Sequence, residues 1–144
     1  MKYTSEIVIE KSVQEISSLL QEPENLHSWM EGLQSVDLLD GDAGKKGAKS
    51  KLVFLHGKKT TEMIETILEL NLPKRMVKTY DSKGINSIIF ITLQPIEINK
   101  TKYIATQEFK LHGFMKVVGF LAPSMFKKQT QKTLNSFKNF AESN

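Results

Sequence analysis

Three polar side chains stand among apolar residues in segments that alternate like β-strands. Tyr103 and Gln107 share the apolar parity of residues 102–111, and Tyr80 closes the strand pattern 76–80. Hydroxyl and amide groups inside an apolar pocket are the kind of groups that orient a bound small molecule. Tyr103 and Gln107 are therefore the better candidates for a binding site. The alternative is that they hydrogen-bond to one another or to water.

Two glutamates are candidates for proton transfer. Glu65 and Glu69 lie in the strand pattern 60–70, where apolar residues fall on both parities. A glutamate that faced the interior could serve as a general acid or base. A glutamate that faced solvent would only be part of a hydrated surface, and the sequence leaves both options open. The irregular alternation predicts a β-bulge or partial burial of both faces.

No motif for a metal, a cofactor or a covalent nucleophile stands out. His27, His56 and His112 include no pair with the i, i+4 spacing of a helical zinc site. No local motif suggests a Ser-His-Asp triad, although such triads form in space rather than in sequence. The glycines of 41–47 lack the Lys-Ser/Thr ending of a phosphate loop. We therefore expect no metal and no cofactor, and we assign no catalytic residue.

The elements that must position these groups begin with a strand over 3–10 and a helix. Ser12 and Glu15 form a capping box at the start of that helix. Pro23 ends it, and a second short helix follows. That helix is predicted from the i, i+3, i+4 spacing of Leu26, Trp29 and Met30. Trp29 would be either a lid over a cavity mouth or a core anchor for the second helix.

Six further strands are predicted from apolar alternation between turn residues. In the strand 49–56, Val53 and Leu55 share a face, which we expect to point inward. The strand 85–96 is the most apolar, with Ile89 and Ile91 on one parity. The predicted strands cover residues 33–39, 49–56, 60–70, 76–80, 85–96 and 102–111.

Residues 113–144 form the only long helical pattern. Pro123 should kink this helix or begin a new one. The part before Pro123 has its own apolar stripe and is interpreted as an adjustable wall of a pocket, gated at the kink. The part after Pro123 is interpreted as permanent core. The two stripes are Phe114, Val117, Val118 and Leu121, followed by Phe126, Leu134, Phe137 and Ala141.

The order and spacing of several short motifs resemble the SRPBCC, or START-like, superfamily, and within it the polyketide cyclase/dehydrase-like group. The resemblance covers nearly the whole chain and implies a single domain over 1–144. It implies an α+β helix-grip fold, in which a curved seven-stranded antiparallel sheet wraps around a long C-terminal helix and two short helices follow strand 1. The motifs that carry it are 5–10 (SEIVIE), Glu22-Pro23, 29–33 (WMEGL) leading to Asp40-Gly41, 72–75 (LPKR), and Pro123 with Phe126.

Members of this superfamily, as the resemblance implies, mostly bind apolar or amphipathic small molecules between the sheet and the last helix. Some cyclise or dehydrate polyketides, some carry lipids, and some bind proteins. The candidate cavity residues are Leu26, Trp29, Met30, Val53, Leu55, Tyr80, Ile89, Ile91, Tyr103, Gln107, Phe109, Phe114, Val118, Leu121 and Met125.

Composition and charge narrow the classes of molecule that the protein could bind. Residues 1–43 carry a formal charge of −7 and residues 44–144 carry +11. Arg75 is the only arginine, which argues against specific nucleic-acid recognition because bidentate base reading prefers arginine.

The absence of cysteine suits a reducing compartment. We see no signal-peptide pattern before the first strand, and the apolar stretch 114–126 is shorter than the roughly 20 residues that span a bilayer. We expect a cytoplasmic protein, either monomer or homodimer.

Three functional hypotheses follow. The first is binding or transport of a hydrophobic small molecule of lipid, polyketide or aromatic type, supported by six methionines that adapt to varied apolar shapes. The second is an enzyme of polyketide cyclase or dehydratase type that uses Tyr103 or a buried glutamate. The third is a module that contacts proteins or a membrane surface through 114–126. We favour the first, without a catalytic role.

Overall fold

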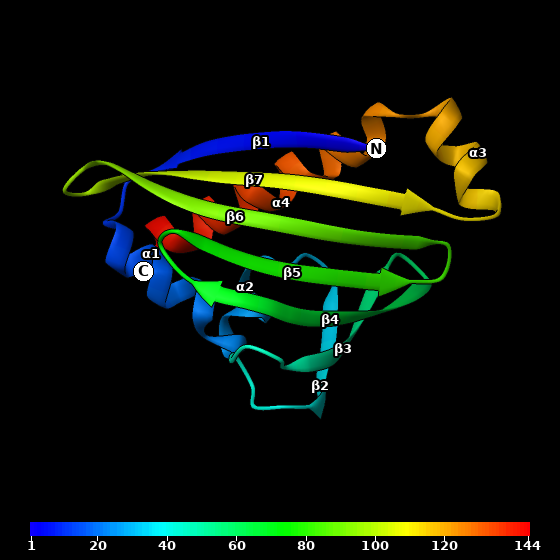
Figure 1. The fold of residues 1–144 in the computed structure, drawn as a ribbon, viewed down its shortest axis with the longest axis horizontal. Coiled ribbons are helices and arrows are strands. Elements are labelled where there is room, and N and C mark those ends of the chain that lie inside the picture. The colour runs from blue at the N-terminus through cyan, green and yellow to red at the C-terminus, as the bar shows by residue number, and fades with distance from the viewer.

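The computed structural model describes residues 1–144 and has the shape of a curved sheet with a long helix crossing its concave side (Figure 1). The sheet has seven antiparallel strands in the order β1-β7-β6-β5-β4-β3-β2. The elements are β1 (Lys2–Ile9), α1 (Val13–Gln21), η1 (Pro23–Asn25), α2 (Leu26–Trp29), β2 (Leu33–Asp40), β3 (Lys49–His56), β4 (Lys59–Asn71), β5 (Arg75–Ser82), β6 (Ile85–Glu97), β7 (Lys100–Leu111), α3 (Phe114–Leu121) and α4 (Ser124–Glu142).

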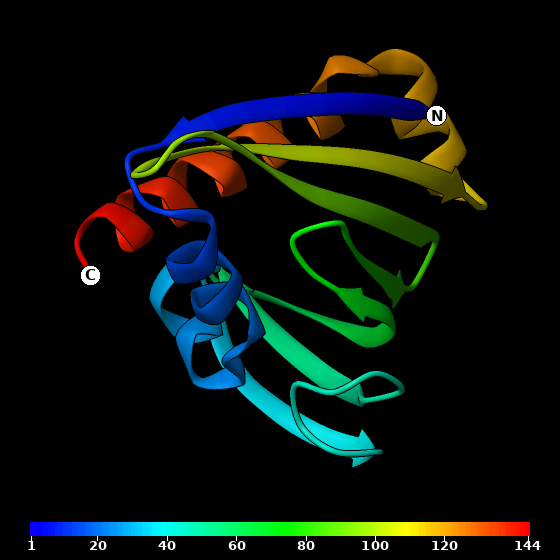
Figure 2. The ribbon, with the colours of Figure 1, turned by 60° about the vertical axis from the view of Figure 1, so that its left-hand side comes forward.

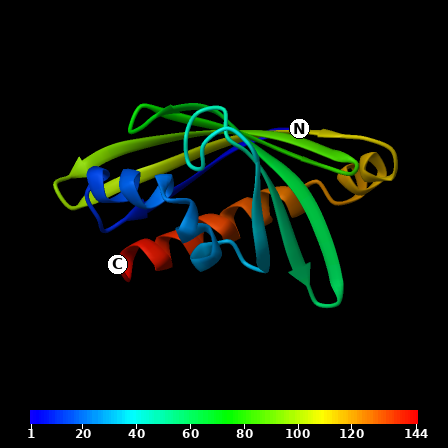
Figure 3. The same ribbon diagram turned by 90° about the horizontal axis from the view of Figure 1, so that it is seen from below.

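The predicted helix-grip arrangement is confirmed. Figure 2 shows α1 and α2 beside the C-terminal part of α4, and Figure 3 shows α4 running obliquely beneath the sheet. α4 lies closest to β1 and α2, and α1 packs on β6. None of the helices combines the length and the apolar character that crossing a bilayer requires.

Local sequence explains where the first helices begin. The Ser12 hydroxyl accepts a hydrogen bond from the Glu15 amide at 3.2 Å, and the Glu15 carboxylate accepts one from the Ser12 amide at 3.0 Å. These two bonds satisfy amides that would otherwise have no partner in the first turn. The hydrogen bond that the Ser12 amide donates to the Glu15 carboxylate lowers the pKa of Glu15, and one donated by the Ser12 hydroxyl at 3.1 Å lowers it further. Pro23 begins η1, where its missing amide is not needed.

The irregular alternation of β4 is a bulge, which is one of the two explanations that the sequence leaves open. Ile67 pairs with Lys78, but Glu69 pairs with Val77, so that Leu68 is an extra residue on β4. A bulge of one residue reverses the facing of everything beyond it. Glu65 therefore faces the interior and is 5% exposed, whereas Glu69 faces outward.

The core lies between the concave face of the sheet and the helices. Phe137 of α4 is completely buried. Its ring meets Trp29 edge-on at a centroid distance of 5.2 Å and lies tilted against Tyr103 at 5.6 Å. Leu134 and Ala141 bury the same face of α4. The part of the chain after Pro123 is therefore permanent core, in agreement with the sequence interpretation.

The predicted facing of β3 is wrong. Leu52 and Phe54 enter the core, and Leu55 is 38% exposed on the outer side together with Val53. Residues 52–55 are an unbroken apolar run, so alternation alone cannot decide which parity faces inward. Pairing decides it, because Leu52 stands opposite Met63, which packs against the core.

The predicted pocket wall before Pro123 is also corrected. Phe114 and Leu121 are 77% and 73% exposed, and Met125, just after Pro123, is 43% exposed. α3 extends beyond the end of β7 and does not lie under the sheet (Figure 1). Only one side of α3 packs on the protein, and most of its apolar side chains point to solvent.

Candidate functional site

The concave face of the sheet is largely apolar, and its only buried charged residues belong to a group near its centre that we call the interior cluster: Glu65, Lys78 and Tyr80. Glu65 stands directly opposite Tyr80 on the neighbouring strand, and Lys78 lies diagonally across from Glu65. Ile67 and Ile89 flank Lys78 on the two adjacent strands. The strands β4 and β5 thus hold a carboxylate, an ammonium and a phenol in one small region of an apolar surface.

Glu65 and Lys78 form a buried ion pair. The Lys78 Nζ lies 3.4 Å from the Glu65 Oε2, and the two side chains are 6% and 7% exposed. At an effective dielectric constant near 20, charges this far apart attract by about 5 kcal/mol. Removing two ions from water costs several kcal/mol for each of them. The pair therefore contributes little net stability, although the loss of either partner would be costly.

Tyr80 completes the interior cluster. Burial raises the pKa of its phenol well above the usual value, and the neighbouring Glu65 carboxylate raises it further. The phenol therefore keeps its proton at neutral pH and can donate a hydrogen bond. Ser87 stands opposite Tyr80 on β6, and its hydroxyl donates to the Tyr80 carbonyl at 3.5 Å.

Gln107 and Tyr103 both face the interior, as their parity predicts, but they do not bond to one another. The Thr130 hydroxyl of α4 lies 2.9 Å from the Gln107 Oε1 and donates to it. That contact ties the middle of α4 to β7. Tyr103 is 3% exposed and packs on Phe137, and burial raises the pKa of its phenol.

Three further polar atoms are buried without a protein partner: Tyr3 Oη, Ser5 Oγ and Trp29 Nε1. Tyr3 and Ser5 belong to the edge strand β1, and Ser5 is 4% exposed. A buried polar atom without a partner costs about 1–3 kcal/mol. Polar groups of a bound molecule, or of water, would find hydrogen-bonding partners on this side of the interior.

Glu69 belongs to a different environment. Its carboxylate lies 2.7 Å from the guanidinium of Arg75, and the two side chains are 35% and 53% exposed. Arg75 also lies over the Phe90 ring, 5.9 Å from its centroid. Of the two glutamates that sequence leaves open, Glu65 is therefore the one that the fold brings inside.

The structure divides the predicted cavity residues into three groups. Leu26, Trp29, Ile91 and Tyr103 belong to the buried core, with Met30, Tyr80 and Ile89 packed against it. Gln107 and Phe109 are partly buried on the same face of β7. Val53, Leu55, Phe114, Leu121 and Met125 lie elsewhere, and Val118 is partly buried on the inner side of α3. Trp29 packs as a core anchor through Phe137.

Sequence reasoning missed Lys78. The signal was present, because Lys78 lies between Met76 and Tyr80 on one face of β5, and these two residues are apolar and aromatic. A lysine in that position is ordinarily assumed to reach solvent. Only the pairing of β5 with β4 shows that the inward-facing Glu65 carboxylate lies beside it.

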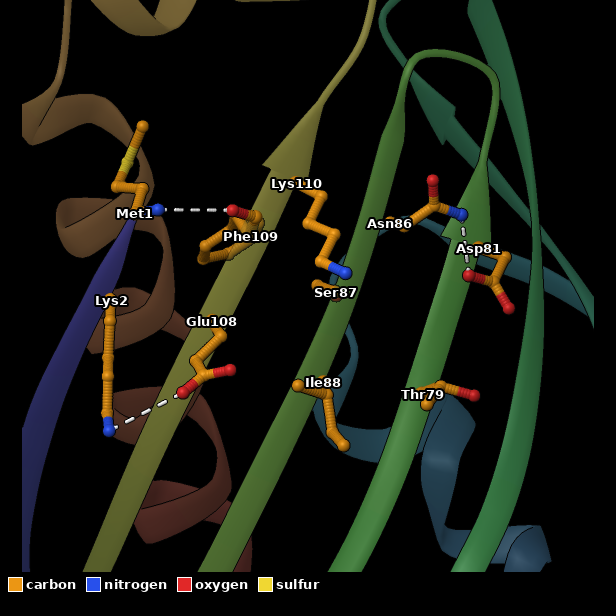
Figure 4. A pocket seen from close by; sticks show the side chains of 10 residues that line it. All are labelled: Met1, Lys2, Thr79, Asp81, Asn86, Ser87, Ile88, Glu108, Phe109 and Lys110. Carbon is orange, nitrogen blue, oxygen red and sulfur yellow. Dashed lines mark hydrogen bonds and ion pairs between the residues drawn. The ribbon is translucent and has the colours of Figure 1, made fainter.

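Two surface pockets lie outside the interior. One, of about 350 Å³, is formed on the outer side of the sheet by residues such as Lys2, Glu108 and Lys110 (Figure 4). The other, of about 410 Å³, follows residues 27–34 around α2 and reaches Ser136 of α4. The first is open, and only three of the ten residues that line it are hydrophobic, so it lacks the enclosing apolar walls that small-molecule sites share.

Comparison with known proteins agrees with this architecture. Residues 1–142 match the model of a protein family described as polyketide cyclase / dehydrase and lipid transport. No curated protein matches the sequence at a significant level. A conserved protein from Geobacillus kaustophilus has a similar structure, with a TM-score of 0.83, 18% identity, and coverage of 99% of this chain and 96% of that chain.

Two other solved structures are similar. Norcoclaurine synthase from Thalictrum flavum, in complex with dopamine and hydroxybenzaldehyde, has a TM-score of 0.75 at 12% identity and covers 100% of this chain and 87% of its own. Ara h 8.0201 has a TM-score of 0.76 at 13% identity, with 100% and 99% covered. At these identities the likeness concerns the fold alone.

Proposed function

Because the chain belongs to the polyketide cyclase/dehydrase and lipid transport family, we propose that it binds an apolar small molecule of lipid, polyketide or aromatic type between the concave face of the sheet and α4. The observation that carries this proposal is the interior cluster of Glu65, Lys78 and Tyr80 on that apolar face. Apolar pockets with a few convergent polar groups are the usual form of small-molecule sites.

The interior cluster also favours a class of ligand. The Lys78 ammonium is already neutralised by Glu65, so a ligand carboxylate would have to compete with Glu65 for it. A carbonyl or hydroxyl oxygen needs no such exchange and can accept from the Lys78 ammonium or the Tyr80 phenol. We therefore propose an apolar ligand with a neutral oxygen function. The unpartnered atoms of Tyr3 and Ser5 support the same view.

Native mass spectrometry of the purified chain, followed by titration with neutral lipids, fatty acids and aromatic polyketides, tests this proposal. We expect binding in the wild type. The double variant Glu65→Leu/Lys78→Met keeps the site apolar and should weaken binding of carbonyl-bearing ligands at least about tenfold, since hydrogen bonds to charged groups are lost. Its affinity for a plain hydrocarbon should stay the same.

Lys58→Met is the matched control, because Lys58 is exposed in the turn between β3 and β4. It should bind every ligand as the wild type does. The proposal is wrong if the wild type binds no member of the panel, or if the double variant and the control bind carbonyl-bearing ligands equally well.

A second candidate function is proton-transfer catalysis of the cyclase or dehydratase type, favoured by the same three side chains. The Glu65 carboxylate could remove a proton next to a ligand carbonyl, while the Lys78 ammonium and the Tyr80 phenol stabilise the charge that develops on the carbonyl oxygen. Under this hypothesis Glu65→Gln abolishes turnover of a polyketone while ligand binding survives. Equal turnover in wild type and variant would rule it out.

A further inference from the structure

The largest group of exposed apolar side chains lies on α3. Phe114, Phe120 and Leu121 are 77%, 85% and 73% exposed, and Val117 is 49% exposed. Met125, four residues beyond Leu121 in the first turn of α4, is 43% exposed. We call these five side chains the α3 patch. Contiguous apolar groups of this kind on a protein surface usually mark a site of interaction.

The patch is presented by a helix that is held in place from its other side. Gly119 packs against Leu111 and Met1, so closely that a Cβ atom would clash with Leu111. Met115 packs on Gly84 in the turn between β5 and β6, and the His112 amide donates to the Gly84 carbonyl at 2.9 Å. α3 therefore turns one face to the protein and leaves the opposite face, which carries the patch, without a partner.

The surroundings of the patch are basic. Residues 109–141 contain six lysines and no aspartate or glutamate. Lys110, Lys116, Lys127 and Lys128 are exposed, and none of them forms an ion pair, whereas Lys132 and Lys138, farther along α4, pair with Glu31 and Glu142. These four lysines beside α3 are therefore not engaged in ion pairs within the protein.

We propose that the α3 patch is a docking surface for an anionic phospholipid bilayer. Exposed aromatic and aliphatic side chains of a short amphipathic helix insert at the level of the headgroups, while lysines beside them meet anionic lipids. Each lysine near an anionic surface adds to the attraction, and the effect extends over about one Debye length. This interaction surface is independent of whether the interior binds a ligand.

A second copy of the chain fits the patch less well. Two copies joined through α3 would bring Lys116, Lys127 and Lys128 of one chain against the same lysines of the other, and like charges in an interface are unfavourable. Protein interfaces are in general depleted in lysine. An anionic lipid surface satisfies the apolar and the basic parts of the patch together.

Flotation of the full chain with vesicles tests the proposal. We expect flotation with phosphatidylcholine vesicles that contain phosphatidylserine, weaker flotation with phosphatidylcholine alone, and loss of binding at high salt. Phe120→Ser/Leu121→Ser should lower the partition coefficient at least about tenfold, since buried apolar area is lost. Lys127→Gln/Lys128→Gln should lower it by about 30-fold at low salt.

Ile98→Ser is the matched control for the apolar variant. Ile98 is 87% exposed in the turn between β6 and β7, at the opposite end of β7 from α3. It should float as the wild type does, and all variants should unfold at the wild-type temperature. The proposal is overturned if the wild type does not float with anionic vesicles, if it floats equally with neutral ones, or if the Phe120 variant floats as well as Ile98→Ser.

Sedimentation velocity of the same proteins distinguishes lipid docking from self-association through the patch. A wild type that floats and sediments as a monomer supports lipid docking. A wild type that dimerises, loses the dimer in Phe120→Ser/Leu121→Ser and does not float would show that the patch serves a second copy instead.

Discussion

At the scale of single residues, the interior cluster is held by pairing across two strands. Glu65 and Lys78 are each 5% exposed, in surroundings of isoleucine and methionine. Neither charge could stay there alone, because an unpaired buried ion costs more than a folded domain of this size can readily supply. The two residues should therefore behave as one unit when they are substituted.

Lys78→Met should destabilise the protein by about 3–5 kcal/mol, because it leaves the Glu65 carboxylate buried without its partner. Glu65→Leu/Lys78→Met removes both charges and should be close to the wild type or more stable. Urea unfolding of the two single variants and the double variant measures the coupling between the sites. A single variant that unfolds like Lys58→Met would contradict the buried pair.

The tyrosines give a second prediction at this scale. The chain has three, and burial raises the pKa of each: Tyr3 to about 12, with Tyr80 and Tyr103 also above the ordinary value of 10.0. The folded state thus keeps phenol protons that the unfolded state releases near pH 10. The free energy of unfolding is therefore unaffected by the ionisation of the tyrosines below pH 10, and it falls as the pH rises from 10 toward the raised pKa values of the folded state.

Absorbance of tyrosinate should therefore not increase around pH 10 while the protein stays folded. It should increase above that pH, together with the loss of circular dichroism. Tyr80→Phe should lessen the fall in stability with pH, and a native protein that shows one full tyrosine titrating near pH 10 would contradict the assignment.

At the scale of elements, the two helices on either side of Pro123 differ in what they pack against. α4 buries Phe126, Leu134, Phe137 and Ala141, whereas the only fully buried residue of α3 is Gly119. α4 is required for the core, while α3 is attached to the end of the sheet. Truncating an aromatic residue should accordingly lower stability strongly in α4 and hardly at all in α3.

Phe137→Ala should cost about 3–5 kcal/mol, because it leaves a cavity between Trp29 and Tyr103. Phe120→Ala removes a side chain of the same size that is 85% exposed, and should change stability by less than about 0.5 kcal/mol. Thermal unfolding of both variants checks this contrast. Similar losses in the two would mean that α3 packs more tightly than its exposure indicates.

The sequence predicts elements of this chain better than it predicts their facing. Periodicity and turn residues locate all seven strands, and Pro123 marks the boundary between α3 and α4. On β3 the run of residues 52–55 is apolar on both parities, so its inward face depends on pairing with β4. Facing is a long-range property, and local alternation determines it only where the two faces differ in polarity.

The same limit explains the candidate site. Tyr103 and Gln107 were recognisable because β7 alternates cleanly. Lys78 and Glu65 become neighbours only through the register of β4 and β5, which is shifted by the bulge. No local sequence pattern shows at which residue the register shifts. The Glu65–Lys78 pair could therefore not be derived from either strand alone.

At the scale of the whole molecule, the acidic first part of the chain is used to neutralise the basic remainder in particular places. Glu6 and Glu10 face Lys102 and Lys100 at the β1–β7 edge, and Glu31 meets Lys132 at 3.1 Å. The region of α3 receives no such partner. Lys110, Lys116, Lys127 and Lys128 thus leave unpaired positive charge beside the apolar patch.

We expect the protein to be a monomer in solution at micromolar concentration. Self-association through the α3 patch would place lysines of both copies together, and this repulsion grows as the salt concentration falls. Sedimentation velocity at low and at high salt measures the state. A dimer that persists at low salt and disappears on substitution of Phe120 would be the contrary result.

The bulge in β4 has a consequence for charge balance. Glu65 and Glu69 are four residues apart, and in a regular strand both would face α4. One additional residue, Leu68, sends the second carboxylate to Arg75 in solvent. The interior therefore contains one anion for one cation and is electroneutral. If Leu68 were paired with Val77 instead of forming the bulge, Glu69 would stand opposite Met76 and bring a second anion inside, so this one unpaired residue sets the net charge of the space beneath the sheet.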